Sequence, residues 1–205
     1  MKSKSQFNIR LSSDGDCIDE KTSIEKNIPQ SQHNQIYFYE DVTTDSSFRL
    51  NKTIDEITKN LQVSSIQMDI PFDALNINLY INSCGGEIFG ALSTIDRIKL
   101  NKIKIHSYVE GIAASAATLL SVVAHTRYIR KNSVMLIHQL SSENWGTYRE
   151  IKDEVKNLDA LMDTIKNIYL NHTKMTETYL NDLLNHDIYL KSQECLELGL
   201  VDFII

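Results

Sequence analysis

The chain has 205 residues, of which 42% are hydrophobic and 23% are charged, a composition typical of a folded globular protein rather than a disordered one. Its 21 basic and 27 acidic side chains give a net charge of −6, which argues against a nucleic-acid partner because phosphate backbones are bound by clustered Lys and Arg. The seven Gly and two Pro are too few for an all-β sandwich with many tight turns, so a mixed α/β or an all-α chain is favoured.

The first 34 residues are polar and show no sustained hydrophobic periodicity. They contain Gly15 and Pro29 and end in a run of Ser, Gln, His and Asn. This composition predicts a flexible N-terminal arm or a removable leader over residues 1–34, followed by one folded domain over residues 35–205.

The pattern from Gln35 onward predicts strands that alternate with amphipathic helices. In chain order, the predicted elements of the first half are a strand at 36–42, a helix at 46–62 with Phe48 on its apolar face, a strand at 77–83, a helix at 88–98, a strand at 104–110 and a helix of small residues at 113–124.

The second half continues with one unusually long helix. Its predicted elements are a short strand around Tyr128, an apolar run at 134–140, a helix at 147–171, a helix at 178–185, a short strand at 187–190 and a C-terminal apolar segment at 200–205. The helix at 147–171 would extend roughly 37 Å at 1.5 Å per residue, longer than a small domain needs, so we expect it to project and meet another chain. Repeated strand–helix units predict an α/β fold with a parallel or spiral sheet.

Two junctions between predicted elements carry residues that suit acyl-transfer chemistry. Gly85-Gly86 ends a strand with unshielded backbone amides, which can point at a developing oxyanion. Ser115 falls where a strand ends and a helix begins, among the free amides of the first helical turn. The spacing alone also fits a tight glycine turn and a serine N-cap. A phosphate-binding loop is excluded, because Ala91-Leu92 follow the last glycine in place of Lys-Ser/Thr.

His138 and Asp187 are the other candidates for chemistry. His138 lies in the apolar run 134–140, which fits either a hydrogen-bonded core histidine or a base that faces an open site. Asp187 follows a polar turn, which fits an exposed carboxylate. The histidines show neither an HExxH motif nor i,i+4 pairing, so the sequence predicts no metal site.

Four segments, in this order, resemble the sequence blocks of the ClpP family, the proteolytic subunit of ATP-dependent Clp proteases. They are YINSCGG, EGIAASAAT, MLIHQL and the stretch from Asp187 through IYLKSQECLELGLVD. The separations are 29 residues from Gly86 to Ser115, 23 from Ser115 to His138 and 49 from His138 to Asp187, all close to those of the family. Their joint occurrence in order makes each block more specific than it is alone.

The resemblance covers residues 36–205 and implies a ClpP/crotonase-like α/β fold, a spiral of βαβ units with a projecting handle helix at about 147–171. It implies an intracellular serine endopeptidase that cleaves unfolded polypeptide inside a ring-shaped chamber. The implied partners are further copies in a heptamer or tetradecamer and an AAA+ unfoldase such as a Clp ATPase. ATP would be used only by that ATPase, so this chain is expected to bind no cofactor, no nucleic acid and no membrane. The implied compartment is the cytoplasm, an organelle stroma or matrix, or the cytoplasm of a phage-infected host.

The family's catalytic residues carry over to matching positions of this chain. Ser115 would be the nucleophile, His138 the base that takes its proton, and Asp187 the carboxylate that orients the imidazole. The backbone amides of Gly86 and Ala116 would form the oxyanion hole.

Several positions depart from the family's pattern. Cys84 stands where the family usually has Pro, which loosens the turn but keeps the amides. Asn185-His186 replace an Asp-Arg pair that links the two rings in many members, which puts that contact in doubt. Asn78 and Glu110 occupy two positions of the apolar cleft that docks ATPase loops in the family. An unpaired carboxylate in such a cleft would weaken docking, so we expect weak coupling to a standard Clp ATPase.

Three alternatives stay open at this level. They are a ClpP-like phage head-maturation protease acting without an ATPase, a catalytically silent ring subunit that scaffolds an active paralogue, and acyl-CoA chemistry on the crotonase architecture. The intact Ser, His and Asp set argues against the last two. If the helix at 147–171 packs against a second ring, a charge at Leu161 or Ile165 should separate double rings into single rings.

Overall fold

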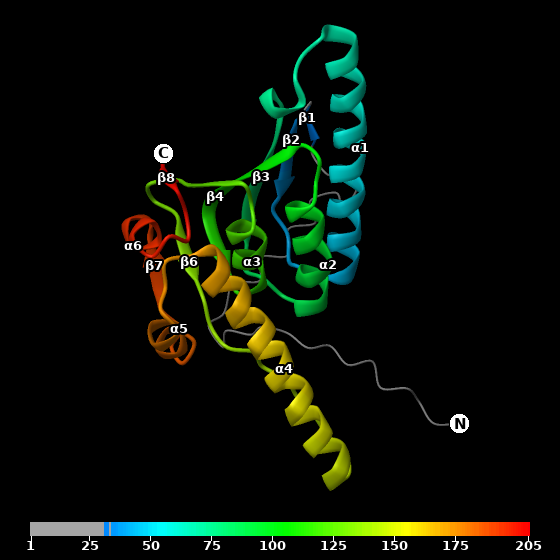
Figure 1. The fold of residues 1–205 in the computed structure, drawn as a ribbon. Coiled ribbons are helices and arrows are strands. Elements are labelled where there is room, and N and C mark those ends of the chain that lie inside the picture. The colour runs from blue at the N-terminus through cyan, green and yellow to red at the C-terminus, as the bar shows by residue number, and fades with distance from the viewer. Residues whose placement is uncertain (1–30, 33) are drawn as a thin grey trace, which may run out of the picture.

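The computed structural model describes residues 31–32 and 34–205, which form an α/β structure (Figure 1). The predicted fold class is confirmed. The predicted arm over 1–34 lies almost entirely outside the described residues, so it stays a prediction. Of that segment, Ser31–Gln32 form a short strand, and the Asn34 side chain donates a hydrogen bond to the Asn76 carbonyl.

The strands of the described residues belong to one sheet. Their bounds are β1 Ser31–Gln32, β2 Gln35–Phe38, β3 Asn76–Ser83, β4 Lys104–Ala114, β5 Thr126–Ile129, β6 Val134–Leu136, β7 Tyr189–Lys191 and β8 Phe203–Ile204. The spatial order is β1-β2-β3-β4-β5-β8, with β6 paired to the end of β4 and β7 paired to β6. Pairing is parallel throughout except for β1–β2 and β6–β7. Parallel neighbours need a crossover, and helices supply it here, as the alternating pattern predicted.

Helices cover the sheet, and one extends away from it (Figure 1). Their bounds are α1 Thr44–Met68, α2 Ile88–Lys99, α3 Ala116–Val122, α4 Tyr148–His172, α5 Glu177–Leu183 and α6 Ser192–Glu197, with a 3-10 turn at Phe72–Ala74. The two longest helices each begin with a capping box: Thr43 and Thr147 accept the backbone N–H of the residue three positions later, whose side chain bonds back. These caps fix where α1 and α4 start.

Strand β3 shows why the two faces of the sheet differ. Ile77, Leu79 and Ile81 are fully buried and pack in the core with residues of α1, α2 and α3. Tyr80 points to the opposite face, since side chains alternate along a strand. There it stacks between Tyr37 and Tyr108, with ring centroids 4.8 Å apart on each side. Stacked rings continue across this face; the aromatic row consists of Tyr37, Tyr80, Tyr108, Tyr128 and Phe203.

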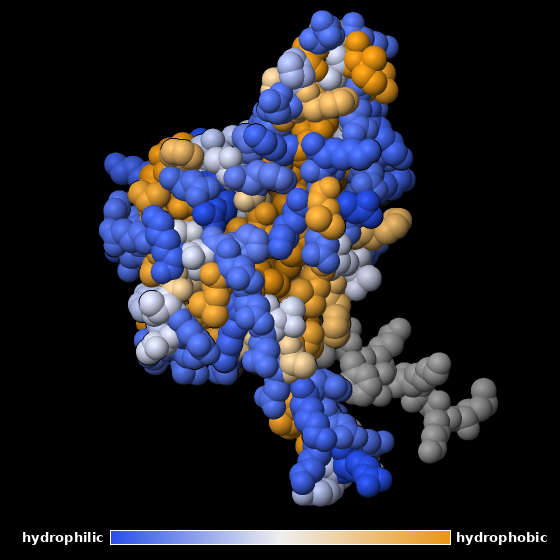
Figure 2. Space-filling view, viewed as in Figure 1, coloured by the Kyte–Doolittle hydropathy of each residue, from blue (hydrophilic) through white to orange (hydrophobic). Residues whose placement is uncertain are grey.

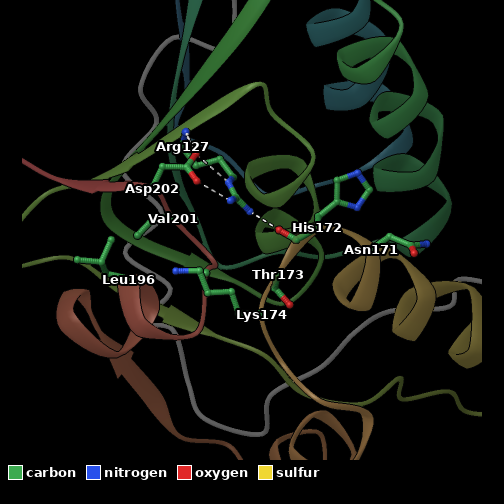
Figure 3. A pocket seen from close by; sticks show the side chains of 9 residues that line it. Arg127, Asn171, His172, Thr173, Lys174, Leu196, Val201 and Asp202 are labelled. Atoms are coloured by element: carbon green, nitrogen blue, oxygen red, sulfur yellow. Dashed lines mark hydrogen bonds and ion pairs between the residues drawn. The ribbon is translucent and has the colours of Figure 1, made fainter.

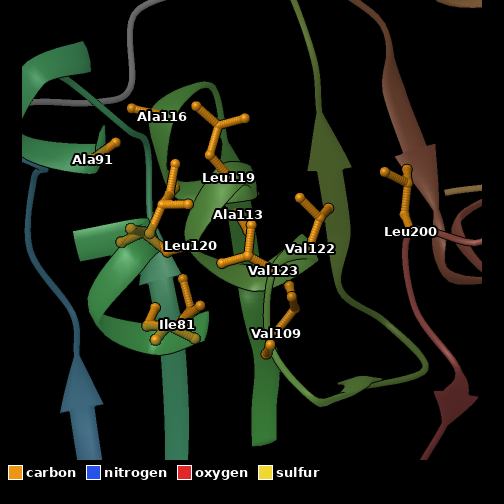
Figure 4. Packing of buried hydrophobic residues seen from close by; sticks show 14 of the residues in the cluster. Ile81, Ala91, Val109, Ala113, Ala116, Leu119, Leu120, Val122, Val123 and Leu200 are labelled. Atoms are coloured by element: carbon orange, nitrogen blue, oxygen red, sulfur yellow. The ribbon is translucent and has the colours of Figure 1, made fainter. Parts of the chain in front are cut away.

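Helix α3 is buried along its whole length. Figure 4 shows its residues Ala116, Leu119 and Leu120 among side chains of β3 and α2. Small residues let this helix approach its neighbours closely. Any side chain at the start of α3 is therefore held by packing on several sides.

Some boundaries differ from the sequence predictions. Strand β4 continues through Gly111, at φ +77°, as far as Ala114, because the register shift between β3 and β4 absorbs the irregularity. The apolar run at 134–140 forms a strand only to Leu136, and the rest leaves the sheet. Phe48 was predicted on the apolar face of its helix, but it is 66% exposed because α1 turns Leu50 to the core.

The long helix α4 projects from the body (Figure 1). Of its 25 residues only Ile165 and Tyr169 are buried. Because Ile165 is part of the protomer's own core, a charge there would destabilise the protomer, so Ile165 is wrong as a probe of ring contacts. The exposed Ile151 and Val155, nearer the free end, are better probes. Among the described residues, no helix combines the length and the apolar character that a bilayer crossing requires.

Candidate active site

The ends of three strands bring Ser115, His138 and Asp187 together. β4 runs parallel to β6, and the backbone N–H of Ser115 donates to the Leu136 carbonyl at 2.8 Å. His138 follows that carbonyl by two residues. β7 runs antiparallel to β6 with Tyr189 opposite Leu136, which returns Asp187 to the side of His138. The backbone pairing therefore places all three predicted residues at the same end of the β4–β6–β7 part of the sheet.

Ser115 forms the corner between β4 and α3 in a strained conformation. Its φ of 58° and ψ of −129° lie in a region that a residue with a Cβ seldom adopts, at a cost of about 1–3 kcal/mol. In the described part of the chain, Asp69 is the one other non-glycine residue with positive φ. Ser115 is also only 2% exposed. A strained serine between a strand and a helix is the geometry of a nucleophile elbow.

The glycine corner at 85–86 packs directly against the Ser115 corner. A Cβ on Gly85 would lie 2.6 Å from the Ala114 carbonyl oxygen and 3.0 Å from the Ala116 nitrogen, and φ is +95°. Only glycine fits there. In the adjoining β-bridge, the Val42 N–H donates to the Gly85 carbonyl and the Glu87 N–H donates to the Val42 carbonyl. The N–H of Gly86 therefore takes no part in the bridge. The two predicted oxyanion donors, Gly86 and Ala116, therefore lie on two backbone corners in contact.

His138 is buried, and its neighbour Asp187 is not. The imidazole is 4% exposed, and burial lowers its pKa, while the negative charge of Asp187 raises it. His138 Nδ1 lies 3.9 Å from Asp187 Oδ1, beyond hydrogen-bond distance, and the carboxylate side chain is 54% exposed. His138 Nε2 is buried and has no hydrogen-bond partner within the described residues. Catalytic hydrogen bonds are often long before substrate binds, so this arrangement suits a base whose partners close later.

Glu110 is paired, contrary to the expectation of an unpaired carboxylate beside the aromatic row. It accepts hydrogen bonds from Arg130, whose Nη2 lies 2.7 Å from Oε1, and from the Tyr39 hydroxyl. Burial, followed by that hydrogen bond, raises the pKa of Tyr39 to about 12. The charge of Glu110 is already balanced within the protomer, which removes the physical reason given for weak docking.

A cavity is lined by residues other than those of this site. It has a volume of about 360 Å³ and lies between the end of α4 and the C-terminal segment. Figure 3 shows Arg127 bonded there to Asp202 and to the carbonyl of His172. Burial raises the pKa of Asp202, but the hydrogen bonds and charge of Arg127 outweigh burial and lower it. The Arg127 guanidinium therefore links β5 to the last residue of α4 and to the residue before β8.

Two buried residues behind Ser115, Thr118 and Tyr169, escaped the sequence predictions. They form a hydrogen bond to each other, and Thr118 Oγ1 also donates to the Ser115 carbonyl. A threonine in an apolar helix and a tyrosine at helical spacing give no sign that they meet, since 51 residues separate them in the sequence.

Comparisons with known proteins identify the family to which the chain belongs. The family model for Clp protease matches residues 30–205. The chain is 29% identical over 159 residues to the ATP-dependent Clp protease proteolytic subunit of Dehalococcoides mccartyi, covering 76% of this chain and 80% of the relative. It is 30% identical over 159 residues to proteolytic subunit 3 of Streptomyces coelicolor, covering 76% and 73%.

A solved structure supports the fold. A ClpP1 mutant from Listeria monocytogenes superposes with a TM-score of 0.70 at 22% identity, covering 84% of this chain and 91% of the other. The architecture is thus that of a ClpP-type peptidase. The chain belongs to the Clp protease family, and its activity is that of a serine peptidase.

Proposed function

We propose that Ser115, His138 and Asp187 form the catalytic triad of this peptidase. Ser115 Oγ attacks the scissile carbonyl carbon, and His138 Nε2 takes its proton and later gives it to the leaving amine. Asp187 holds the tautomer with Nδ1–H and stabilises the imidazolium. The low pKa that burial gives His138 keeps the imidazole neutral, which is the form a base requires.

The backbone N–H groups of Gly86 and Ala116 stabilise the tetrahedral oxyanion. Each donor of this kind is worth about 3 kcal/mol of transition-state stabilisation. The contact between Gly85 and Ser115 supports this role, because it sets the two corners side by side. The chain is proposed to need neither a metal nor another cofactor for this chemistry.

The observation that carries the triad is that His138 Nε2 is buried and lacks a hydrogen-bond partner among the described groups. His138 also lies two residues after Leu136 of β6, whose carbonyl accepts the Ser115 N–H. The test is labelling by a fluorophosphonate, followed by mass spectrometry of the modified peptide. We expect the label on Ser115 and its loss in Ser115→Ala and His138→Ala. Labelling of another serine, with full peptide hydrolysis by Ser115→Ala, would overturn the assignment.

The chain is proposed to assemble as a homo-oligomer, a heptamer or tetradecamer, through surfaces that include α4. Large apolar side chains near its free end are exposed, with Trp145 at 98%, Tyr148 at 75% and Val155 at 53%. Figure 2 shows that the projecting end is mainly hydrophilic with a small hydrophobic patch, as expected for a rim around a contact. Multi-angle light scattering of the wild type and Val155→Glu tests this, with Lys156→Glu as the matched surface control. A stable wild-type monomer at micromolar concentration would contradict it.

The aromatic row is proposed as the surface that docks a partner AAA+ ATPase, which feeds unfolded polypeptide to the peptidase. The row lies on the face of the sheet opposite the core. The exposed Ile66 and Met68 lie in the last turn of α1, and the exposed Ile70 follows that helix. The relatives' names describe ATP-dependent proteases.

Because Arg130 balances the charge of Glu110, Glu110→Met should not tighten binding of a Clp ATPase, and Tyr108→Ser should weaken that binding. A tightening of about tenfold by Glu110→Met would restore the desolvation argument.

Two other functions remain as alternatives to the cytoplasmic, ATPase-linked peptidase. A phage head-maturation protease would cleave capsid protein without an ATPase. A catalytically silent ring subunit would not be labelled by a fluorophosphonate. Hydrolysis of a fluorogenic peptide, with and without a Clp ATPase and ATP, separates the three. We expect peptide hydrolysis alone and degradation of an unfolded protein only with the ATPase.

A further inference from the structure

The carbonyl behind the proposed nucleophile is held by a short chain of buried hydroxyl groups. Thr118 Oγ1 donates to the Ser115 carbonyl oxygen at 2.6 Å, and the Thr118 backbone N–H donates to the same oxygen at 3.0 Å. The Tyr169 hydroxyl lies 2.5 Å from Thr118 Oγ1. Thr118 is 0% exposed and Tyr169 is 2% exposed, so no water competes with these contacts.

The direction of these hydrogen bonds follows from counting protons. A carbonyl oxygen only accepts, so the single hydroxyl proton of Thr118 is committed to Ser115. Tyr169 must therefore donate to Thr118 Oγ1. Burial raises the pKa of Tyr169 well above its usual range, despite the hydrogen bond to Thr118, which lowers it. The phenol thus remains a proton donor at every working pH, and both buried hydroxyls are satisfied.

Fixing the Ser115 carbonyl also fixes the next amide. A peptide unit is planar and trans, so the Ser115 C=O and the Ala116 N–H belong to one rigid plane and point in opposite directions. Two donors that hold the carbonyl therefore aim the Ala116 N–H the other way. Ser115 has the strained φ of 58°, so this orientation needs such support.

We propose that Thr118 and Tyr169 are positioning residues that aim the Ala116 N–H at the oxyanion, with Tyr169 acting through Thr118. This inference rests on the proposed role of Ser115 and Ala116. It also places a determinant of the site on α4, because Tyr169 lies in the last turn of that helix. Neither side chain needs to touch the substrate.

The test uses the full chain and three substitutions. Thr118→Val removes the hydroxyl and keeps the shape, Tyr169→Phe removes the phenol oxygen, and Thr118→Ser keeps a hydroxyl. Ser107→Ala is the matched control, since Ser107 is another buried hydroxyl that bonds α3, at Ser121, away from the corner. The readouts are kcat and KM for a fluorogenic peptide, and inhibition by a peptide aldehyde, whose adduct places an oxyanion in the hole.

We expect kcat to fall about 10- to 100-fold for Thr118→Val and Tyr169→Phe, less than the roughly 10²–10³ lost with an oxyanion donor itself. KM should stay within about twofold, and aldehyde affinity should fall in step with kcat. Thr118→Ser should recover most of the loss. The double variant should lose no more than Thr118→Val alone, because Tyr169 acts through Thr118.

Several results would overturn the inference. These are wild-type kcat in both variants, a loss that appears mainly in KM, an equal loss in Ser107→Ala, or no recovery in Thr118→Ser. If Tyr169→Phe fails to fold, the comparison of Val with Ser at position 118 still decides. Full activity of Ser115→Ala would instead refute the proposed triad, so the two failures are distinguishable.

Discussion

The nucleophile side and the carboxylate side of the site are built in opposite ways. Ser115 lies at a buried corner fixed by its own N–H bond to β6, by Thr118 and by the adjoining glycine turn. Asp187 lies in the segment before β7, is half exposed, and is 3.9 Å from His138. The strained corner is held by these backbone and side-chain contacts, whereas the half-exposed carboxylate is not enclosed in the same way. The difference indicates that the backbone around Ser115 is preformed, whereas the contacts that His138 makes through its two ring nitrogens are the adjustable part.

Breaking the nucleophile side should have the largest effect. Ser115→Ala should lower peptide hydrolysis by about 10⁴- to 10⁶-fold, as expected for loss of a triad nucleophile. Because loss of a helix-start serine costs only about 0.5–2 kcal/mol, the variant should still fold. A fluorogenic peptide assay and thermal denaturation measure both, with Ser93→Ala on the surface of α2 as the control.

Asp187→Asn tests the adjustable side. If the pair closes during catalysis, kcat should fall by about 10²- to 10⁴-fold, the upper value being that of a fully formed triad. Loss of the negative charge removes the influence that raises the pKa of His138, so that pKa falls further below 6.5. The acid limb of the pH profile of kcat/KM should therefore move to lower pH. An unchanged rate would mean that Asp187 takes no part.

Gly85→Ala tests how tightly the two corners fit. The added Cβ would meet the Ala114 carbonyl oxygen at 2.6 Å, and alanine would be forced to φ +95°. We expect a loss of stability of about 1–3 kcal/mol from backbone strain, with a similar contribution from overpacking. Denaturant unfolding measures it. Gly146→Ala, whose φ is not positive and whose new Cβ would meet the Glu150 side chain of the α4 capping box, should cost no more than about 1 kcal/mol.

Asp202→Asn sharpens the comparison by weakening a charged contact outside the site. The folded-state pKa of Asp202 is lowered, so its ionised form stabilises the fold above the unfolded pKa of about 3.8, and this contribution is lost as the pH falls through the folded value. At neutral pH we expect a loss of about 1.5–3 kcal/mol, typical of hydrogen bonds to a charged group. The difference between wild type and variant should shrink below pH 3.8 in urea titrations. A difference that stays constant with pH would contradict the linkage.

The sequence predicted what depends on local patterns. The alternation at 77–83 and the helical spacing at 88–98 each follow from one buried face, and the glycines at 85–86 mark a corner whatever surrounds it. The positions of Ser115, His138 and Asp187 came from the family's motifs, and the fold brings them together.

The rest depends on pairings between distant segments. Arg130 neutralises Glu110 because β4 and β5 are parallel neighbours, which spacing along the chain does not reveal. The sequence predicts a strand end at Gly111, yet β4 continues past it and pairs with β6 from Ile112 to Ala114. The 3.9 Å distance between His138 and Asp187 depends on the conformation of the exposed segment before β7, which no sequence motif specifies.

The chain's single tryptophan offers a built-in reporter. Trp145 precedes α4 and is 98% exposed, so in an isolated protomer its indole is surrounded by water. If the neighbouring apolar side chains of α4 are covered when copies associate, that indole loses water and its emission shifts to the blue. Dilution series could then follow association and subunit exchange by intrinsic fluorescence, with no dye attached to the protein.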